Sequence, residues 1–514
     1  MITKTYSALM QGLTPHQVEI ECQTTQGKPN LILIGLANQA LEEAKERICS
    51  ALASCNVRLK NRKTIINLAP AQLRKDNSCL ELAIAVSLYL TTLENAVDVS
   101  KNIYFGELSL AGEIRPIRGA LSLVLAAKEL GFKNVFLPKA QLEEVKVVDG
   151  VNVYGLDHLQ TLLDFLHKKI ALKPLEPKSF HPNNNKRSDA NFSQIIGQEN
   201  AKRCLEIAAA GGHNLLLMGV PGSGKSMLAS SLTSILPPLT KEEAIAVTKI
   251  YSLCGLLDDD GLITKRPFRS PHHSISSVGL VGGSSKLLPG EISLSHHGIL
   301  FLDELAEFKR EALEALRQPL ESGEVAITRA VGRVVFPANF TLIAASNPCP
   351  CGHYGSKRQP CTCSTLTRDK YLKKLSGPIL DRIDMQIFVG EVDGDALMKK
   401  DDKNKSQNNS DSSVILDRVC QAREVQSWRL KKHGLVTNCQ LTSPLVREIC
   451  GLNLDSQKLL TSAVEKWQLS ARSYFKIIKV ARTIADLQAS PDERIQKKHL
   501  AEALQYRLGL NNSF

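Results

Sequence analysis

An octapeptide at residues 219–226 constrains this 514-residue sequence more than any other feature. It matches G-x-x-x-x-G-K-[ST], a pattern whose glycines let backbone N–H groups close around phosphates. An apolar run precedes it and a helical run follows it, which is the strand, loop and helix order that the pattern requires. We expect Lys225 to reach the β and γ phosphates of ATP and Ser226 to ligate Mg²⁺. The predicted phosphate-binding residues are Gly219, Val220, Pro221, Gly222, Ser223, Gly224, Lys225 and Ser226.

Two later runs of strand length also end in polar side chains. Residues 298–304 end in Asp303 and Glu304, and residues 340–347 end in Asn347. Because ligands of a parallel sheet bind at the carboxyl ends of its strands, we expect these side chains in the same site. Asp303 would bind the metal or its waters, Glu304 would act as base toward the attacking water, and Asn347 would position that water. Two surface acids and a turn-initiating Asn-Pro are the alternatives.

The chain length predicts more than one domain, because a single hydrophobic core stops growing at roughly 250–300 residues. Two polar segments lack any hydrophobic period and are interpreted as a linker and a loop. Strand-like and helix-like runs alternate elsewhere, so the predicted fold class is α/β. The predicted divisions are an α/β block at 1–168, a linker at 169–190, a parallel-sheet core at 191–398, a polar loop at 399–413 and a helical domain at 414–514.

Hydrophobic spacing predicts individual elements within these divisions. The longer helices are expected beyond residue 413, and a hairpin is expected within residues 324–340, with its tip near 330–332. The other predicted strands are 31–36, 64–70 and 214–219, and the predicted helices are 38–54, 80–90, 414–430, 456–469, 474–488 and 497–508.

Composition limits the function without assigning one. The chain carries 64 basic and 52 acidic residues, a formal net charge of +12, which permits a polyanionic partner such as nucleic acid. No stretch approaches the ~18–20 apolar residues that span a bilayer. The first residues also lack the regions of a secretory signal. We therefore expect a soluble cytoplasmic protein with mostly reduced cysteines.

Four of the 13 cysteines form the pattern C-x-C-x₉-C-x-C. Four thiolates can satisfy tetrahedral Zn²⁺ and stabilise a loop that has little core of its own. Reduced free thiols and redox pairing are the alternatives, and His353 is a possible replacement ligand. The predicted zinc ligands are Cys349, Cys351, Cys361 and Cys363.

The order of these motifs resembles that of the AAA+ ATPases. More narrowly, the chain is similar over essentially its whole length to the magnesium-chelatase-like proteins of the ComM/YifB type. The specific motifs are RPFRSPHHSIS (266–276), PGEISLSHHGILFLDEL (289–305), NPCPCGHYG (347–355), SGPILDRID (376–384) and SARSYFKIIKVARTIADL (470–487).

The resemblance assigns roles to arginines that spacing alone does not reveal. Arg382 matches the arginine that such ATPases insert into the neighbouring subunit's nucleotide site, which implies a ring, expected to be hexameric. Arg472 matches the arginine of the lid domain that senses nucleotide, and Arg482 on the same helix is a second candidate. A surface or salt-bridging arginine is the alternative in each case.

Two basic segments are candidates for contact with DNA. Residues 265–297 correspond to an insert that reaches toward the central pore in the resembled ATPases. The hairpin carries Arg329 and Arg333 beside its tip, and basic groups on pore loops would attract a phosphate backbone without reading sequence. The histidine pairs could instead bind metal or fill polar surface. The candidate residues for contact with DNA within the insert are Arg269, His272, His273, Lys286, His296 and His297.

The N-terminal block resembles the Lon-type peptidase domain but departs from its catalytic pattern. The serine position falls at about Cys79, with Ser78 beside it, and the lysine position falls at Leu121. Without a base, a serine–lysine mechanism has no proton acceptor. We therefore predict a peptidase fold without peptidase activity.

The leading interpretation is an ATP-driven ring motor that moves branched or single-stranded DNA. By family resemblance, this would be branch migration of the joint formed when imported DNA is integrated during natural transformation. The alternatives are a remodelling chaperone of the magnesium-chelatase type and an ATP-dependent protease. No membrane partner is expected.

Overall fold

The computed structural model describes residues 2–35, 38–70, 78–180, 191–257, 261–283, 287–329, 332–356, 358–375, 377–391, 412–489 and 494–508. The chain forms two compact units. Unit 1 comprises Met1–Pro182, Thr240–Thr264 and Gly332–Val335, and unit 2 comprises Asn183–Leu239, Lys265–Val331 and Phe336–Phe514.

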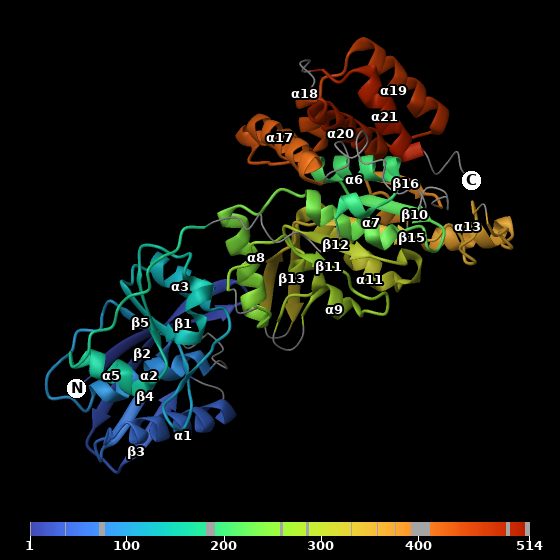
Figure 1. Cartoon of the computed structure of the whole chain (residues 1–514). Helices are drawn as coiled ribbons and strands as arrows, with labels where there is room; N and C mark the ends of the chain where they lie inside the picture. Colours follow the sequence, from blue (N-terminus) through green and yellow to red (C-terminus); the bar gives the residue numbers. More distant parts are fainter. Residues whose placement is uncertain are drawn as a thin grey trace. The chain divides into compact units, whose positions relative to one another are not determined.

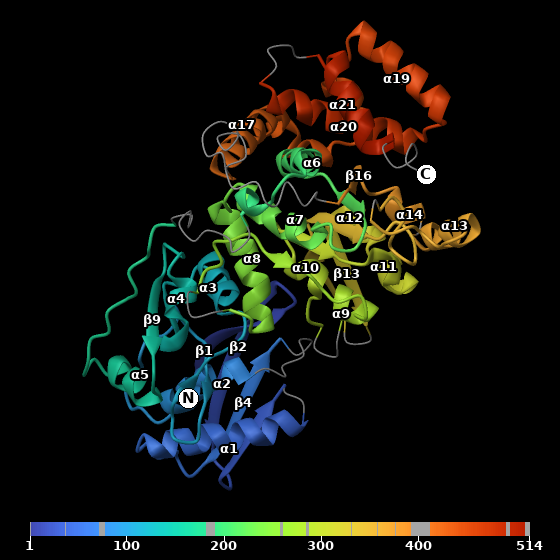
Figure 2. The ribbon, with the colours of Figure 1, turned by 45° about the vertical axis from the view of Figure 1, so that its right-hand side comes forward.

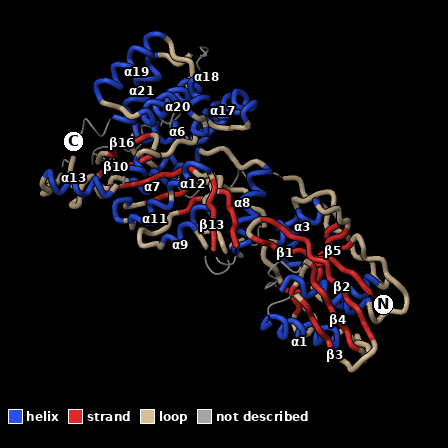
Figure 3. Tube along the Cα trace, turned by 180° about the vertical axis from the view of Figure 1, so that it is seen from behind, coloured by secondary structure: helices blue, strands red, loops and turns tan. Residues whose placement is uncertain are grey.

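Unit 1 begins with a four-stranded sheet whose order is β1-β2-β4-β3 (Figure 3). The neighbours β1/β2 and β2/β4 are antiparallel, whereas β3/β4 is parallel. Thr5 and Ser7 of β1 are buried and donate to backbone carbonyls of Ala83 and Tyr104, so their burial leaves no unpaired hydroxyl. Helices α1 and α2 pack beside this sheet (Figure 2). The bounds are β1 Ile2–Gln11, β2 Thr14–Thr25, β3 Asn30–Ile34, α1 Asn38–Ser54, β4 Lys63–Ala69 and α2 Glu81–Leu90.

A three-stranded parallel sheet completes the N-terminal part of unit 1, with β8 in the centre. The rings of Tyr104, Phe136 and Tyr154, one from each strand, stack with 5.1 Å between neighbouring centroids. The elements here are β5 Asn102–Tyr104, β6 Glu107–Leu108, β7 Ile114–Arg115, α3 Ala120–Glu129, β8 Asn134–Pro138, α4 Leu142–Val145, β9 Asn152–Leu156 and α5 Leu159–Leu166.

Helix α8 (Lys241–Cys254) belongs to unit 1, although it lies inside the segment that the sequence assigns to the parallel-sheet core. It begins at a capping box formed by Thr240 and Glu243. It packs against α3, and the Ser252 hydroxyl donates to the buried carboxylate of Glu144. These long-range contacts are invisible to a boundary drawn from composition.

Unit 2 contains a five-stranded, all-parallel sheet in the order β11-β12-β15-β10-β16 (Figure 1). Its three central strands are buried apolar runs, as expected for a sheet covered on both faces. The sequence prediction of an α/β fold with a parallel sheet is therefore confirmed. The strands are β10 Leu215–Gly219, β11 Phe268–Arg269, β12 Ile299–Leu302, β15 Thr341–Ser346 and β16 Met385–Val389.

Unit 2 also contains helices of 4 to 13 residues and the first strand of a hairpin. The hairpin pairs β13 (Glu324–Arg329) with β14 (Gly332–Pro337), and residues 330–331 lie outside the described residues. The helices are α6 Glu199–Gly211, α7 Lys225–Ser231, α9 Ser277–Val281, α10 Glu291–Leu294, α11 Arg310–Ala315, α12 Arg317–Ser322, α13 Thr365–Lys374 and α14 Gly377–Leu380.

The rest of unit 2 is helical, and its α17 and α20 pack on α6 (Figure 1). Asp384, directly before β16, joins these helices to the sheet. It accepts from the Asn214 backbone N–H at 3.0 Å and lies 2.9 Å from Lys476 Nζ on α20. The helices are α17 Ser412–Leu430, α18 Ser443–Ile449, α19 Leu454–Trp467, α20 Ala471–Leu487 and α21 Lys497–Leu508.

The predicted elements agree with the observed ones to within a few residues. The polar loop predicted at 399–413 falls mostly on residues that the structure does not describe, and α17 begins at Ser412. Within the described residues, no helix is both long and apolar enough to cross a membrane.

Candidate nucleotide-binding site

The predicted phosphate loop joins the end of β10 to the start of α7. Gly222 and Gly224 have φ of +76° and +86°, a conformation that L side chains rarely adopt. Lys225 begins the helix, and its Nζ donates to the Gly219 and Val220 carbonyls at 2.8 and 3.0 Å. The loop therefore has the glycine-dependent turn and the inward lysine that phosphate binding requires.

Burial lowers the pKa of Lys225, and the nearby carboxylates of Asp303 and Glu304 oppose this shift. The ammonium also lies 3.3 Å from Asn347 Oδ1, at the end of β15. A buried ammonium whose partners in the described structure are neutral oxygens, with carboxylates only nearby, is suited to an anionic ligand. The structure thus brings Lys225 and Asn347 together from residues 122 positions apart.

Ser226 and Asp303 also meet, with Ser226 Oγ donating to Asp303 Oδ2 at 2.7 Å. The other carboxylate oxygen of Asp303 accepts from the Glu304 N–H at 2.9 Å. A hydroxyl and a carboxylate at a phosphate loop are the oxygen ligands that Mg²⁺ takes in such sites. The donor set therefore fits Mg²⁺ held together with a nucleotide.

Glu304 has a partner that the sequence did not indicate. Its Oε2 lies 3.1 Å from His273 Nδ1, and its backbone is left-handed, with φ of +52°. His273 follows β11, which pairs in parallel with the strand that leads to Glu304. The RSPHH motif was available as a signal, but a two-residue strand has no periodicity by which to place it.

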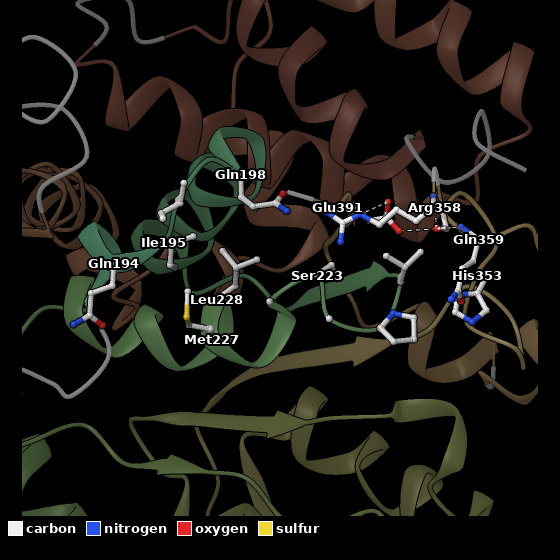
Figure 4. A pocket seen from close by; sticks show the side chains of 16 residues that line it. Gln194, Ile195, Gln198, Ser223, Met227, Leu228, His353, Arg358, Gln359 and Glu391 are labelled. Atoms are coloured by element: carbon white, nitrogen blue, oxygen red, sulfur yellow. Dashed lines mark hydrogen bonds and ion pairs between the residues drawn. The ribbon is translucent and has the colours of Figure 1, made fainter. Parts of the chain in front are cut away.

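A cavity of about 610 Å³ adjoins the phosphate loop. Figure 4 shows Gln194, Ile195 and Gln198 on one side of Ser223, and His353, Arg358 and Gln359 on the other. The residues just before α6 fall within the predicted parallel-sheet core, but no signal in the sequence indicated that they line the site. The full lining is Gln194, Ile195, Ile196, Gln198, Val220, Pro221, Gly222, Ser223, Gly224, Met227, Leu228, His353, Ser356, Arg358, Gln359 and Glu391.

The arginines assigned by resemblance lie in two settings. Arg382 forms an ion pair with Glu321 at the end of α12, and its side chain is only 9% exposed. Arg472 is 61% exposed and lies 4.0 Å from the same carboxylate. Arg482 is buried on α20 and is bound to Asp486 at 2.9 Å, which makes it part of the helical core.

The four predicted cysteine ligands lie together. Their sulfurs are within 4.8 Å of one another, and the Cys349–Cys351 and Cys349–Cys361 separations are 3.4 and 3.7 Å. This cluster could hold a metal ion. His353 does not belong to it and lines the cavity instead.

The basic residues of the insert are largely engaged in local contacts. Arg269 binds both carboxylate oxygens of Glu291, at 2.6 and 2.7 Å. Burial lowers the pKa of His296 to about 3, with a smaller effect from His297, so His296 is neutral near pH 7. Its Nδ1 accepts from the Asn339 N–H at 3.0 Å. These residues support the loop rather than present charge to solvent.

Other parts of the insert and the hairpin expose polar groups. The ring of His272 contacts that of His273 in a tilted arrangement, with 4.1 Å between centroids and 35° between planes, and His272 Nδ1 lies 2.8 Å from the Ser274 hydroxyl. Arg329 and Arg333 are exposed, and Arg329 Nε donates to the Gly283 carbonyl at 3.2 Å. Lys286 lies outside the described residues.

The positions that correspond to peptidase residues are buried in unit 1. Burial raises the pKa of the Cys79 thiol to about 12, and its Sγ lies 3.5 Å from the Ala8 carbonyl oxygen. Leu121 is buried, and its N–H donates to Glu144. The side chain of Ser78 lies outside the described residues. Neither described position offers an activated nucleophile or a base.

A phosphate loop on a parallel sheet, an acidic strand end beside it and a helical cap define the class of AAA+ ATPases. Comparison with known families agrees. Residues 191–397 match the family described as magnesium chelatase, subunit ChlI; residues 20–141 match subunit ChlI of Mg-chelatase; and residues 409–507 match its C-terminal domain.

Individual relatives narrow this class. The chain is 40% identical to protein YifB of Salmonella typhimurium, and 39% identical to competence protein ComM of Haemophilus influenzae; each alignment covers 98% of this chain and 96% of the relative. Lon protease 2 of Bacillus subtilis is 23% identical over 34% of this chain and 33% of its own length. The chain belongs to the magnesium-chelatase-like family of the ComM/YifB type.

Proposed function

We propose that this protein is an ATP-hydrolysing ring motor that moves branched or single-stranded DNA. The cellular process would be branch migration during the integration of imported DNA in natural transformation. The relative that supports this assignment carries competence in its name. The net charge of +12 is compatible with a polyanionic substrate.

The observation that carries the ATPase part is the convergence of Ser226 and Asp303 beside Lys225. The phosphate loop would hold the nucleotide, and Ser226 and Asp303 would hold Mg²⁺, which neutralises charge on the β and γ phosphates. Glu304 would accept a proton from the attacking water, and Asn347 would orient that water.

A complete site also needs a positive charge toward the transferred phosphoryl group. We assign this role to Arg382 of the neighbouring subunit in a hexameric ring, and we assign nucleotide sensing to Arg472. Because Arg382 is ion-paired with Glu321 within its own chain, the pair would have to separate when a neighbour docks.

We further propose that the cysteine cluster binds Zn²⁺. Four sulfurs within 4.8 Å of one another match the ligand number and type of a structural zinc site. We also propose that the protein is cytoplasmic. The cytoplasm keeps thiols reduced, so the four cysteines could bind metal there.

Two other functions have less support from the sequence and the structure. A chaperone of the magnesium-chelatase type would explain the ATPase fold, but it gives no reason for relatedness to a competence protein over 98% of the chain. An ATP-dependent protease would need an activated nucleophile and a base. Leu121 supplies no base, and Cys79 is buried with a raised pKa.

The test uses purified full-length protein with ATP and Mg²⁺ on labelled Holliday junctions, forks and linear duplexes. We expect junction and fork products to depend on ATP, with casein left intact. ATP hydrolysis without processing of any DNA would reject the DNA assignment, and cleavage of casein would favour the protease.

A further inference from the structure

The cysteine cluster and the nucleotide cavity are built from one stretch of chain. Cys349 lies two residues after Asn347, whose amide oxygen is 3.3 Å from Lys225 Nζ. The segment between the two cysteine pairs then supplies a wall of the cavity before it returns to Cys361 and Cys363. Its lining residues are His353, Ser356, Arg358 and Gln359.

This segment approaches the phosphate loop very closely. Gly352 has φ of +82°, and a Cβ at that position would lie 2.7 Å from Pro221 Cγ. Gly355 has φ of +83°, and its Cβ would lie 3.0 Å from the ring of Phe388 on β16. The segment is therefore seated against the phosphate loop and against the strand next to β10 at positions where glycine is required.

Polar contacts fix the segment at its far end. Ser356 Oγ donates to Glu391 Oε1 at 2.6 Å and accepts the backbone N–H groups of Arg358 and Gln359, each at 3.1 Å. Arg358 Nε lies 3.9 Å from the other oxygen of Glu391. The positions of the side chains that face the cavity therefore depend on the backbone conformation between the two cysteine pairs (Figure 4).

Almost no hydrophobic burial holds this path. Among described residues 349–356 and 358–363, only Cys349 and Gly352 are buried. With so little burial, the conformation of the loop depends on these polar contacts and on cross-links, and metal binding by four thiolates is such a cross-link. Loss of the metal would therefore release the cavity wall and the residues that follow Asn347.

We infer that the metal-bound cysteine cluster is a working part of the nucleotide site, so that metal and nucleotide each tighten the binding of the other. This inference rests on the proposed binding of ATP at the phosphate loop. The metal is a thiophilic divalent cation such as Zn²⁺, taken up as the thiols release protons. Because coupling between two sites is reciprocal, the factor is the same in both directions.

The test measures equilibrium binding of a fluorescent ADP analogue to full-length protein in three states: zinc-loaded, stripped by a chelator, and reloaded with zinc. We expect stripping to weaken ADP binding by roughly tenfold, within the range usual for coupled sites, and reloading to restore it. Competition with a chelator of known affinity should show zinc binding tightened by the same factor when unlabelled ADP is present.

A cysteine variant provides an independent check. Cys361→Ser combined with Cys363→Ser should lose zinc and show the ADP affinity of stripped protein. The control is Cys49→Ser, which replaces a half-buried cysteine on α1 of unit 1 and should change neither zinc content nor ADP affinity.

The outcomes separate this inference from the proposed function. Equal ADP affinity with and without bound zinc overturns the coupling while leaving the ATPase assignment intact. Protein that neither contains nor takes up zinc overturns the metal site. Zinc-loaded protein that binds no ADP overturns both the inference and the proposed function.

Discussion

His273 Nδ1 lies 3.1 Å from Glu304 Oε2. The two residues follow neighbouring parallel strands, since β11 pairs with β12 through Phe268↔Ile299 and Arg269↔Leu300. The proposed catalytic base is therefore held by an imidazole from the insert at 265–297. This contact keeps one oxygen of Glu304 occupied and so restricts how the carboxylate can approach an attacking water.

His273→Ala should raise basal ATP hydrolysis, because it removes that contact from Glu304. Lowering the activation barrier by ~1.4 kcal/mol would increase the hydrolysis rate about tenfold, and we expect the increase to be no larger than this. ADP affinity should stay constant, since His273 does not line the cavity. His272→Ala is the matched control. If hydrolysis by His273→Ala falls as far as that of Glu304→Gln, the imidazole is needed to orient the base.

Lys225→Ala and Glu304→Gln should fail at different steps. Loss of Lys225 removes a charged contact with phosphate and should weaken nucleotide binding by roughly tenfold or more. Glu304→Gln should keep ATP bound but slow its hydrolysis by about 10²–10⁴-fold, the usual contribution of a general base. Equilibrium binding and single-turnover hydrolysis separate the two effects. Near-normal turnover by either variant would contradict the site.

Arg382 should act on the nucleotide of a neighbouring subunit. Arg382→Ala and Lys225→Ala subunits, each inactive alone, should regain part of the ATPase activity when mixed, because some interfaces then pair an intact phosphate loop with an intact arginine. Glu321→Gln, which removes the ion pair between Glu321 and Arg382, should retain hydrolysis. Verified mixed rings that stay inactive would count against the assignment.

Asp384 should make unit 2 sensitive to acid. Burial raises its pKa, but Lys476 and His213 outweigh this effect and hold the pKa well below the usual range. The carboxylate therefore contributes stability above the unfolded pKa of about 3.9, and that contribution is lost as the pH falls through the lower folded value. Asp384→Asn should cost about 3–5 kcal/mol at neutral pH, since Lys476 keeps a buried charge without a counterion.

Thermal unfolding of the full chain between pH 2 and pH 7 tests this effect. The variant should melt lower at neutral pH and lose less of its melting temperature on acidification than the unchanged protein. Asp381→Asn is the control, because its carboxylate is 47% exposed. Parallel curves for Asp384→Asn and the unchanged protein would show that another group carries the acid sensitivity.

The sequence located the elements of this site whose signals are local. The phosphate loop and the acidic end of β12 are short patterns attached to apolar strands, so both strands and the side chains at their ends could be placed from spacing. The parallel sheet followed from the same alternation of elements.

Features that depend on long-range pairing could not be placed in this way. His273 faces Glu304 because a two-residue strand joins the sheet edge, and α8 belongs to unit 1 because of Ser252 and its neighbours. Burial also differs between residues that occur in similar sequence patterns. His273 and His296 each belong to a His-His pair, but His296 is buried while His273 is partly exposed.

The hairpin should contribute to DNA binding through Arg333 and Arg329. Both residues are exposed, and neither forms part of the nucleotide cavity as described, so their loss should leave basal hydrolysis unchanged. If each neutralises one phosphate, the double alanine variant should bind DNA more weakly and reduce the slope of log affinity against log salt by about 2. Stimulation of hydrolysis by DNA should disappear.

Single variants distinguish contact from support within the hairpin. Arg329→Ala also removes a hydrogen bond to the Gly283 carbonyl of the insert, whereas Arg333→Ala has no such structural cost among the contacts described. Arg310→Ala, an exposed arginine on α11, is the control for loss of charge. Equal losses of basal ATPase and DNA affinity would indicate a structural role. An unchanged salt slope in Arg333→Ala would place the phosphate contacts elsewhere, because each lost contact must reduce the number of counterions released.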